Sequence, residues 1–165
     1  MRLFTALVPP AEAVAQVAAA LAGPAPDGWR LVDPATWHIT LAFHGDVDDP
    51  APHLAALDAA AGLPGPRLRV DGSGAFPGVR WARVVAEPRA ALDALVEAVG
   101  GDAQGFVPHI TVLRRRGRRR PEPRAVLPPL SGPWWQADEV LLMASELRRD
   151  GAVHRIVHRV ALTRG

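Results

Sequence analysis

Two short segments of this sequence share a pattern that could perform acid–base chemistry. Residues 37–41 read Trp-His-Ile-Thr-Leu, and residues 108–112 read Pro-His-Ile-Thr-Val. Because side chains alternate between the two faces of a β-strand, each copy places His and Thr on one face and the aliphatic residues on the other. The aliphatic face favours a core. If the two strands lie close together, the repeated pattern predicts one site with two imidazoles and two hydroxyls.

These side chains suit reactions at a phosphate. Histidine can take and give a proton near neutrality, since its unperturbed pKa is about 6.5. His38 and His109 on opposite sides of a phosphate could act as general acid and general base, each contributing roughly 10²–10⁴ in rate. The hydroxyls of Thr40 and Thr111 could donate to phosphate oxygens, and a nearby arginine could offset the developing charge. This chemistry needs no metal, and we expect no cofactor.

Other histidines allow other interpretations. On a regular strand His44 would share the face of His38 and Thr40. It could contact substrate there, form part of a metal site with His38, or end the strand at the surface. His154 and His158 are four residues apart in a predicted strand, which would place them on one face as a candidate metal pair without an evident third ligand.

Positive charge is concentrated late in the chain. All 19 basic residues are arginine. Residues 1–113 contain seven arginines against twelve acidic residues, whereas residues 114–165 contain twelve against five. Residues 114–120 read Arg-Arg-Arg-Gly-Arg-Arg-Arg, directly after the second His-Ile-Thr. Such a run attracts phosphate-rich partners, although it is also typical of a solvated loop.

Length and composition indicate an ordinary globular protein. The chain has 165 residues, of which 48% are hydrophobic and 22% charged, enough for a single domain over residues 1–165. The absence of cysteine excludes disulfides, thiolate metal sites and a cysteine nucleophile. We see no signal peptide and no apolar run of about eighteen residues, so we expect a cytoplasmic location and no membrane partner. A monomer would suffice.

Hydrophobic periodicity predicts an α+β fold. Helices are expected at residues 10–21, 50–61 and 88–99. Strands are expected at residues 2–8, 37–43, 67–70, 79–87, 106–113, 140–147 and 153–162, the last two joined by a turn at 148–151. A helix precedes each His-Ile-Thr strand, which suggests a diverged internal duplication with two α+β lobes.

The two His-x-Thr (HxTx) motifs resemble those of the 2H phosphoesterase superfamily. Within it, the chain is similar to the RNA 2′,3′-cyclic phosphodiesterases, also described as 2′,5′-RNA ligases. The resemblance covers nearly the whole chain. It is carried by the opening segment 2–7, the first motif 37–47, the Gly-Ala-Phe-Pro segment 74–77, the second motif 106–114 and the strand 140–147.

The resemblance implies a role for each motif residue. His38 would be the proton donor and His109 the proton acceptor, because a 2′-phosphate product makes O3′ the leaving oxygen. Thr40 and Thr111 would bind the phosphate, and Arg114 would contact phosphate or nucleotide. The implied fold is bilobed and pseudo-two-fold, with an antiparallel sheet and helices in each lobe and the active-site cleft between them. The implied partners are RNA with 2′,3′-cyclic phosphate ends or cyclic nucleotides.

Some features fit this pattern less well. Arg114 has the opposite strand parity from His109, so it reaches the cleft only if the strand ends or twists there. Phe43 has core parity, which predicts packing, although the resemblance leaves a stacking role open. Residues 144–146 read Ala-Ser-Glu where the family has Glu-Ser. The alternative functions are reversible 2′,5′-RNA ligation and a non-catalytic RNA- or nucleotide-binding module.

Overall fold

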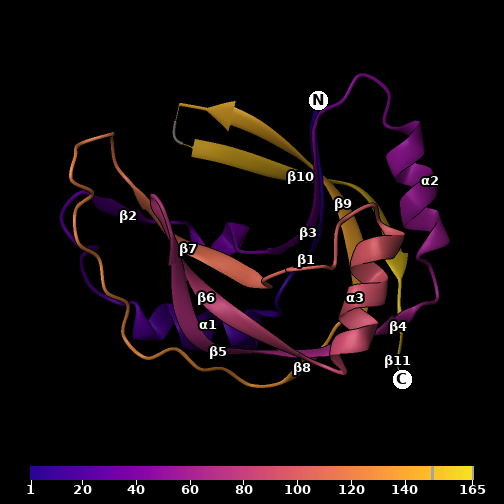
Figure 1. The fold of residues 1–165 in the computed structure, drawn as a ribbon, viewed down its shortest axis with the longest axis horizontal. Coiled ribbons are helices and arrows are strands. Elements are labelled where there is room, and N and C mark those ends of the chain that lie inside the picture. The colour runs from indigo at the N-terminus through magenta and orange to yellow at the C-terminus, as the bar shows by residue number, and fades with distance from the viewer. Residues whose placement is uncertain (150, 165) are drawn as a thin grey trace.

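The computed structural model describes residues 1–149 and 151–164, and it is built from two antiparallel sheets with helices against them (Figure 1). The first sheet has the strand order β10-β9-β1-β3. Its strands are β1 (Arg2–Leu7), β3 (Ile39–Asp46), β9 (Glu139–Arg148) and β10 (Gly151–Ala161). The predicted turn at 148–151 includes Asp150, which lies outside the described residues.

The second sheet has the strand order β2-β7-β6-β5-β8. Its strands are β2 (Trp29–Leu31), β5 (Arg67–Phe76), β6 (Val79–Glu87), β7 (His109–Arg115) and β8 (Trp135–Gln136). A separate parallel pair joins β4 (Pro64–Gly65) to β11 (Thr163–Arg164). The short strands β2, β4, β8 and β11 were not predicted, because segments of two or three residues are too short to show a period.

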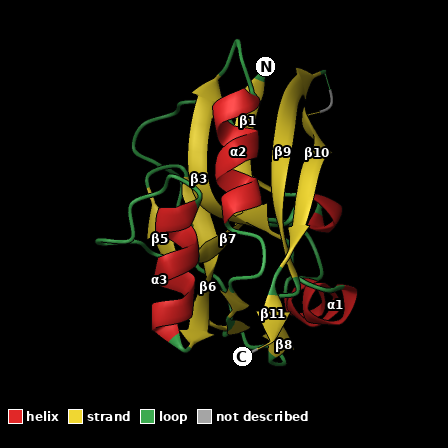
Figure 2. Cartoon of the chain, turned by 90° about the vertical axis from the view of Figure 1, so that its right-hand side faces the viewer, coloured by secondary structure: helices red, strands yellow, loops and turns green. Residues whose placement is uncertain are grey.

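The three predicted helices are present. They are α1 (Ala11–Ala20), α2 (Ala51–Ala59) and α3 (Arg89–Ala98), with a 3-10 turn η1 at Pro34–Thr36. The Asp49 carboxylate accepts from the amide of Ala51 at 3.0 Å, which satisfies a free donor where α2 begins. In Figure 2, α2 covers the sheet that contains β1 and β9, and α3 covers the sheet that contains β6. No helix of the described residues is long and apolar enough to cross a membrane.

The two sheets repeat one arrangement, which confirms the predicted two-fold α+β fold. In the first sheet β1 lies between β9 and β3, and in the second β6 lies between β5 and β7. Each His-Ile-Thr strand therefore pairs antiparallel with an inner strand of its own sheet, β3 with β1 and β7 with β6. One buried cluster contains residues of both sheets, among them Ile39 and Ile110. The aliphatic face of each motif thus packs in the core, as the alternation predicts.

Candidate active site

The two motif histidines are anchored in the same way. The Nδ1–H group of His38 donates to the carbonyl of Thr36 at 2.8 Å, and that of His109 donates to the carbonyl of Val107 at 2.7 Å. A carbonyl can only accept, so each neutral ring carries its proton on Nδ1. The Nε2 atoms of both rings are left for a ligand. β3, which follows His38, and β7, which begins at His109, lie against each other across the two sheets.

A β-bulge follows the first His-Ile-Thr. Ala6 on β1 pairs with Thr40, and the next residue along β1 toward its start, Thr5, pairs with Ala42. Leu41 is therefore an extra residue on β3. An extra residue shifts all later side chains to the opposite face.

An equivalent bulge follows the second His-Ile-Thr. Trp81 on β6 pairs with Thr111, and its neighbour Arg80 pairs with Leu113. Val112 is the extra residue on β7. The duplicated strands thus share the bulge as well as the motif.

The two bulges bring Phe43 and Arg114 onto the face of the His-Thr pairs. Phe43 pairs with Phe4 and is 61% exposed, so the prediction that Phe43 packs in the core is wrong. Arg114 lies near enough to His38 for its charge to affect that imidazole. The bulge at Val112 is the irregularity that Arg114 needs to reach the face of His109. Phe43 and Arg114 each lie three residues after the motif threonine, so they occupy equivalent positions in the two lobes.

His44 lies on the other face of its sheet. Leu3 pairs with Gly45 and Phe4 with Phe43, so His44 is a second extra residue on β3. Its Nε2 is hydrogen-bonded to the hydroxyl of Thr5 at 2.8 Å. Its ring stacks on His53 of α2 at a centroid distance of 4.0 Å. The expectation that His44 shares the face of His38 is therefore wrong.

A bulge also separates His154 from His158. Ile156 pairs with Met143 and His158 with the adjacent Leu142, so one residue of β10 is extra between them. His158 faces α2, where its Nε2 lies 2.8 Å from Asp58. His154 faces the other way, toward His38. The predicted one-sided histidine pair is wrong.

Aromatic rings hold both motif histidines in place. The ring centroid of His38 is 4.8 Å from Phe4 and 5.1 Å from His154. The ring of His109 is 5.5 Å from Trp81 and 5.4 Å from Phe76. Sequence reasoning did not assign Phe4 or His154 to the site, because their neighbours across the strands are unknown without the register.

The glycine of the Gly-Ala-Phe-Pro segment leaves space for an indole ring. Gly74 pairs with Trp81 on the adjacent strand, and a Cβ atom at position 74 would overlap the indole ring. The glycine lets the indole lie across β5 and reach His109. The Gly-Ala-Phe-Pro segment was therefore the one feature of the sequence that pointed to the aromatic residues around His109.

The late strand contributes less than its resemblance implies. Ala144 is buried in the core, and Glu146 pairs with Arg148 at 3.4 Å on the exposed hairpin. Ser145 pairs across the strands with His154 and therefore shares its face. Met143 shares this face as well, because it pairs with Phe4, whose ring contacts His38.

The electrostatic environment of the site is positive. The pKa of His38 is lowered to about 4, mainly by burial and in smaller part by the charges of His154, Arg114 and His109, while the hydrogen bond to the Thr36 carbonyl opposes this change. Loss of water around the guanidinium is the main reason that the pKa of Arg114 is lowered, and the neighbouring charge of Arg30 adds to it. The structure therefore brings His38, His109 and Arg114 together in a place that favours an anion.

Known structures resemble this chain over almost its full length. E. coli LigT in complex with phosphate is 30% identical, with a TM-score of 0.78 and coverage of 99% of this chain and 98% of that chain. E. coli LigT in complex with 3′-AMP is 30% identical, with a TM-score of 0.77 and the same coverage. The protein TT0787 of Thermus thermophilus is 32% identical, with a TM-score of 0.75 and coverage of 98% and 97%.

A family model described as LigT like Phosphoesterase matches residues 7–86. No curated protein matches the chain. The resemblance seen in the motifs is confirmed by identity and fold over the whole length. This chain belongs to the LigT-like phosphoesterase family of the 2H phosphoesterase superfamily.

Proposed function

We propose that this phosphoesterase opens 2′,3′-cyclic phosphates, at RNA ends or on nucleotides, to give 2′-phosphates. One observation carries the proposal. Two imidazoles from equivalent strands each have Nδ1–H held by a backbone carbonyl, which leaves Nε2 for a ligand, and Arg114 lies near the His38 ring. Two proton-transfer groups and one fixed cation are what an in-line displacement at a phosphodiester requires.

The hydrolytic step uses the two histidines in opposite ways. Nε2 of His109 takes a proton from water as the water oxygen forms its bond to phosphorus. The bond from phosphorus to O3′ breaks, and Nε2 of His38 gives a proton to that oxygen. The hydroxyls of Thr40 and Thr111 donate to the non-bridging oxygens, while the guanidinium of Arg114 offsets their growing charge.

The donor role requires a protonated His38. In the free protein a pKa of about 4 keeps this imidazole neutral at pH 7. A phosphodiester anion bound between the rings opposes the positive neighbours and stabilises the imidazolium, so binding of substrate raises the pKa of His38. Protonation of the donor is thereby coupled to binding of the substrate.

The relatives support a nucleotide-sized ligand. E. coli LigT has been solved with phosphate, with 3′-AMP, with ATP and with NADP+. Each of these ligands contains a phosphate, and three contain a nucleotide. We infer that this chain also accepts a phosphate attached to a nucleotide in the site formed by His38, Thr40, His109 and Thr111, called here the His–Thr site.

Hydrolysis of 2′,3′-cyclic AMP in the presence of a chelator tests the proposal. We expect 2′-AMP as the product, identified by chromatography against 2′-AMP and 3′-AMP standards. His38→Ala and His109→Ala should each lower kcat by roughly 10²–10⁴. His158→Ala is the matched control, because His158 lies on the opposite face of its sheet and pairs with Asp58.

Three outcomes would contradict the proposal. Activity retained in either motif variant would remove its histidine from the reaction. Activity abolished by the chelator would mean that a metal is required. Binding of the nucleotide by the wild-type protein without turnover would favour a binding module instead.

A further inference from the structure

Two arginines face each other where β2 pairs with β7. Arg30 is the direct cross-strand partner of Arg114, so both side chains lie on one face of the sheet. Like charges at directly opposite positions are destabilising. Neither guanidinium forms an ion pair with a carboxylate in the part of the chain that the structure describes. This pair continues the positive charge of the His–Thr site outward along the strand.

The arginine loop, residues 116–120, begins where β7 ends. In Figure 1 the orange segment that follows β7 runs along the same edge of the molecule as β2. The four arginines of this loop are exposed, and none of them forms an ion pair among the described residues. The loop therefore displays four positive charges that no carboxylate of residues 1–149 and 151–164 neutralises.

Specific contacts hold the loop at its base. The amide of Arg116 donates to the carbonyl of Gly28 at 2.7 Å. On the far side, Glu122 accepts from the Gly78 amide and from Arg80, the latter at 3.1 Å.

Trp29 fixes the same end of the loop. Its indole N–H donates to the carbonyl of Pro123 at 2.9 Å, and the guanidinium of Arg80 lies over the ring at 4.4 Å from the centroid. Glu122, the carboxylate that directly follows the loop, is thus occupied by Arg80 and not by the loop arginines. The loop is thus held in position, and the described part of the chain offers its arginines no ion-pair partner.

We propose that Arg30 and the arginine loop form a second anion-binding site, which binds internal phosphates of a single-stranded RNA whose cyclic end lies in the His–Thr site. This inference rests on the proposed function. Six strand residues separate His109 from the loop, and a strand rises about 3.3 Å per residue, so the loop begins roughly 20 Å from the imidazole. A mononucleotide cannot span that distance, whereas an oligonucleotide can.

The test compares two substrates that share the reacting group. One is 2′,3′-cyclic AMP, and the other is an oligoadenylate of eight nucleotides with a 2′,3′-cyclic phosphate end. In Arg118→Gln/Arg119→Gln we expect kcat/KM for the oligonucleotide to fall roughly tenfold at low salt. The value for 2′,3′-cyclic AMP should stay within twofold, because the mononucleotide does not reach the loop.

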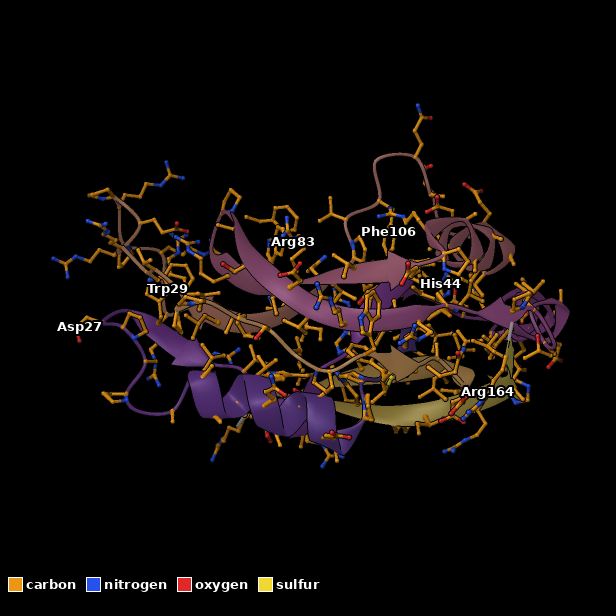
Figure 3. All side chains as sticks on the ribbon, turned by 90° about the horizontal axis from the view of Figure 1, so that it is seen from below. Asp27, Trp29, His44, Arg83, Phe106 and Arg164 are labelled. Atoms are coloured by element: carbon orange, nitrogen blue, oxygen red, sulfur yellow. The ribbon has the colours of Figure 1, made fainter. Side chains whose placement is uncertain are left out.

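Salt dependence gives a second readout. Each contact to a single-stranded phosphate contributes about 0.7 to the slope of log affinity against log salt. The double variant should therefore lower that slope by about 1.4 for the oligonucleotide. Arg155→Gln/Arg164→Gln is the control with the same change in charge. Figure 3 shows Arg164 at the end of the molecule opposite Trp29 and Asp27, far from the base of the loop.

Equal loss for both substrates would overturn the inference, since the loop would then act through the His–Thr site. Equal loss in the control variant would reduce the effect to overall charge. Failure of the proposed function is a separate result: the wild-type protein would hydrolyse neither substrate. In that case, fluorescence anisotropy with an unreactive octaadenylate still tests the loop. Affinity that does not depend on Arg118 and Arg119 would overturn the binding site itself.

Discussion

The imidazole of His154 lies edge-on to that of His38, with ring centroids 5.1 Å apart and an angle of 81° between the planes. Phe4 contacts both rings, at 4.8 Å from His38 and 5.1 Å from His154. Nδ1 of His154 is shielded from solvent and has no hydrogen-bond partner within the described residues. His154 therefore acts on His38 in two ways: its ring packs against the imidazole, and its charge opposes protonation of it.

His154→Phe separates these two effects. Phenylalanine keeps a ring against His38 and Phe4 but carries no charge, so the pKa of His38 should rise from about 4. The rise should be partial, because burial is the largest cause of the lowered pKa and remains. NMR titration of His38 in the free protein measures this change. kcat at pH 7 should stay within about threefold, since ring packing is retained.

His154→Ala provides the comparison. This variant removes the charge and the ring together. We expect the His38 side chain to be less well ordered, kcat to be lower and the pKa of His38 to rise as in His154→Phe. If His154→Phe leaves the pKa of His38 unchanged, His154 serves packing alone.

Acidification should destabilise the fold through His38. Its pKa is about 4 in the folded protein and 6.5 as the ordinary value, so between these limits the unfolded chain binds the proton more readily. The stabilisation by neutral His38 is complete above pH 6.5 and is lost as pH falls toward 4. The span corresponds to about 3 kcal/mol in the free energy of unfolding. Urea unfolding at pH 7 and pH 4 measures the loss.

His38→Gln isolates this contribution. Glutamine keeps a donor for the Thr36 carbonyl but does not titrate, so the variant should lose less stability on acidification than the wild-type protein. Carboxylates contribute equally to both proteins and cancel in the comparison. Equal losses in the two proteins would show that His38 is not the group responsible.

The two faces of each motif could be predicted from the sequence, because His, Thr and their aliphatic partners keep strict alternation within five residues. Beyond each motif the alternation fails at one residue. Two consecutive aliphatic residues, Leu41-Ala42 and Val112-Leu113, are buried together around each bulge. That pair of apolar neighbours is a visible interruption of the pattern, and it could have predicted that Phe43 and Arg114 turn to the active face.

Other parts of the site depend on contacts between distant segments. Trp29 reaches Pro123 across 94 positions, and Glu122 reaches Gly78 across 44. The periodicity of a segment carries no information about such partners. The bulge near Val157 is also hidden, since residues 151–161 keep the composition of a regular strand. The pairing register of the long strands, rather than their identity as strands, could not be predicted from the sequence.

Phe43 should bind the base of the substrate. Its ring is exposed on the active face, beside Phe4, and the guanidinium of Arg2 lies 5.6 Å from its centroid. Stacking of a base on an aromatic side chain is worth about 1–3 kcal/mol. Phe43→Ala should therefore raise KM for 2′,3′-cyclic AMP by about tenfold with little change in kcat. Phe43→Trp should keep KM near the wild-type value, and a KM unchanged in Phe43→Ala would place the base elsewhere.

Glu122→Gln should loosen the arginine loop without touching the His–Thr site. Glutamine retains an acceptor for the Gly78 amide but loses the ion pair with Arg80. We expect faster hydrogen exchange at the amide of Arg116, which donates to Gly28 across the base of the loop. The kcat/KM for the octanucleotide should fall, whereas the kcat/KM for 2′,3′-cyclic AMP should not.

The pKa of Glu122 decides the pH at which its contacts with the Gly78 amide and Arg80 are lost. The Gly78 amide, followed by the hydrogen bond from Arg80, lowers the pKa of Glu122 below its ordinary value of 4.5. The stabilisation by the carboxylate is therefore present above pH 4.5 and is lost only as pH falls through the lowered pKa. Glu146→Gln is the control, because its pair with Arg148 lies on the β9–β10 hairpin. Equal exchange at Arg116 in Glu122→Gln and wild-type protein would mean that the ion pair of Glu122 does not hold the loop.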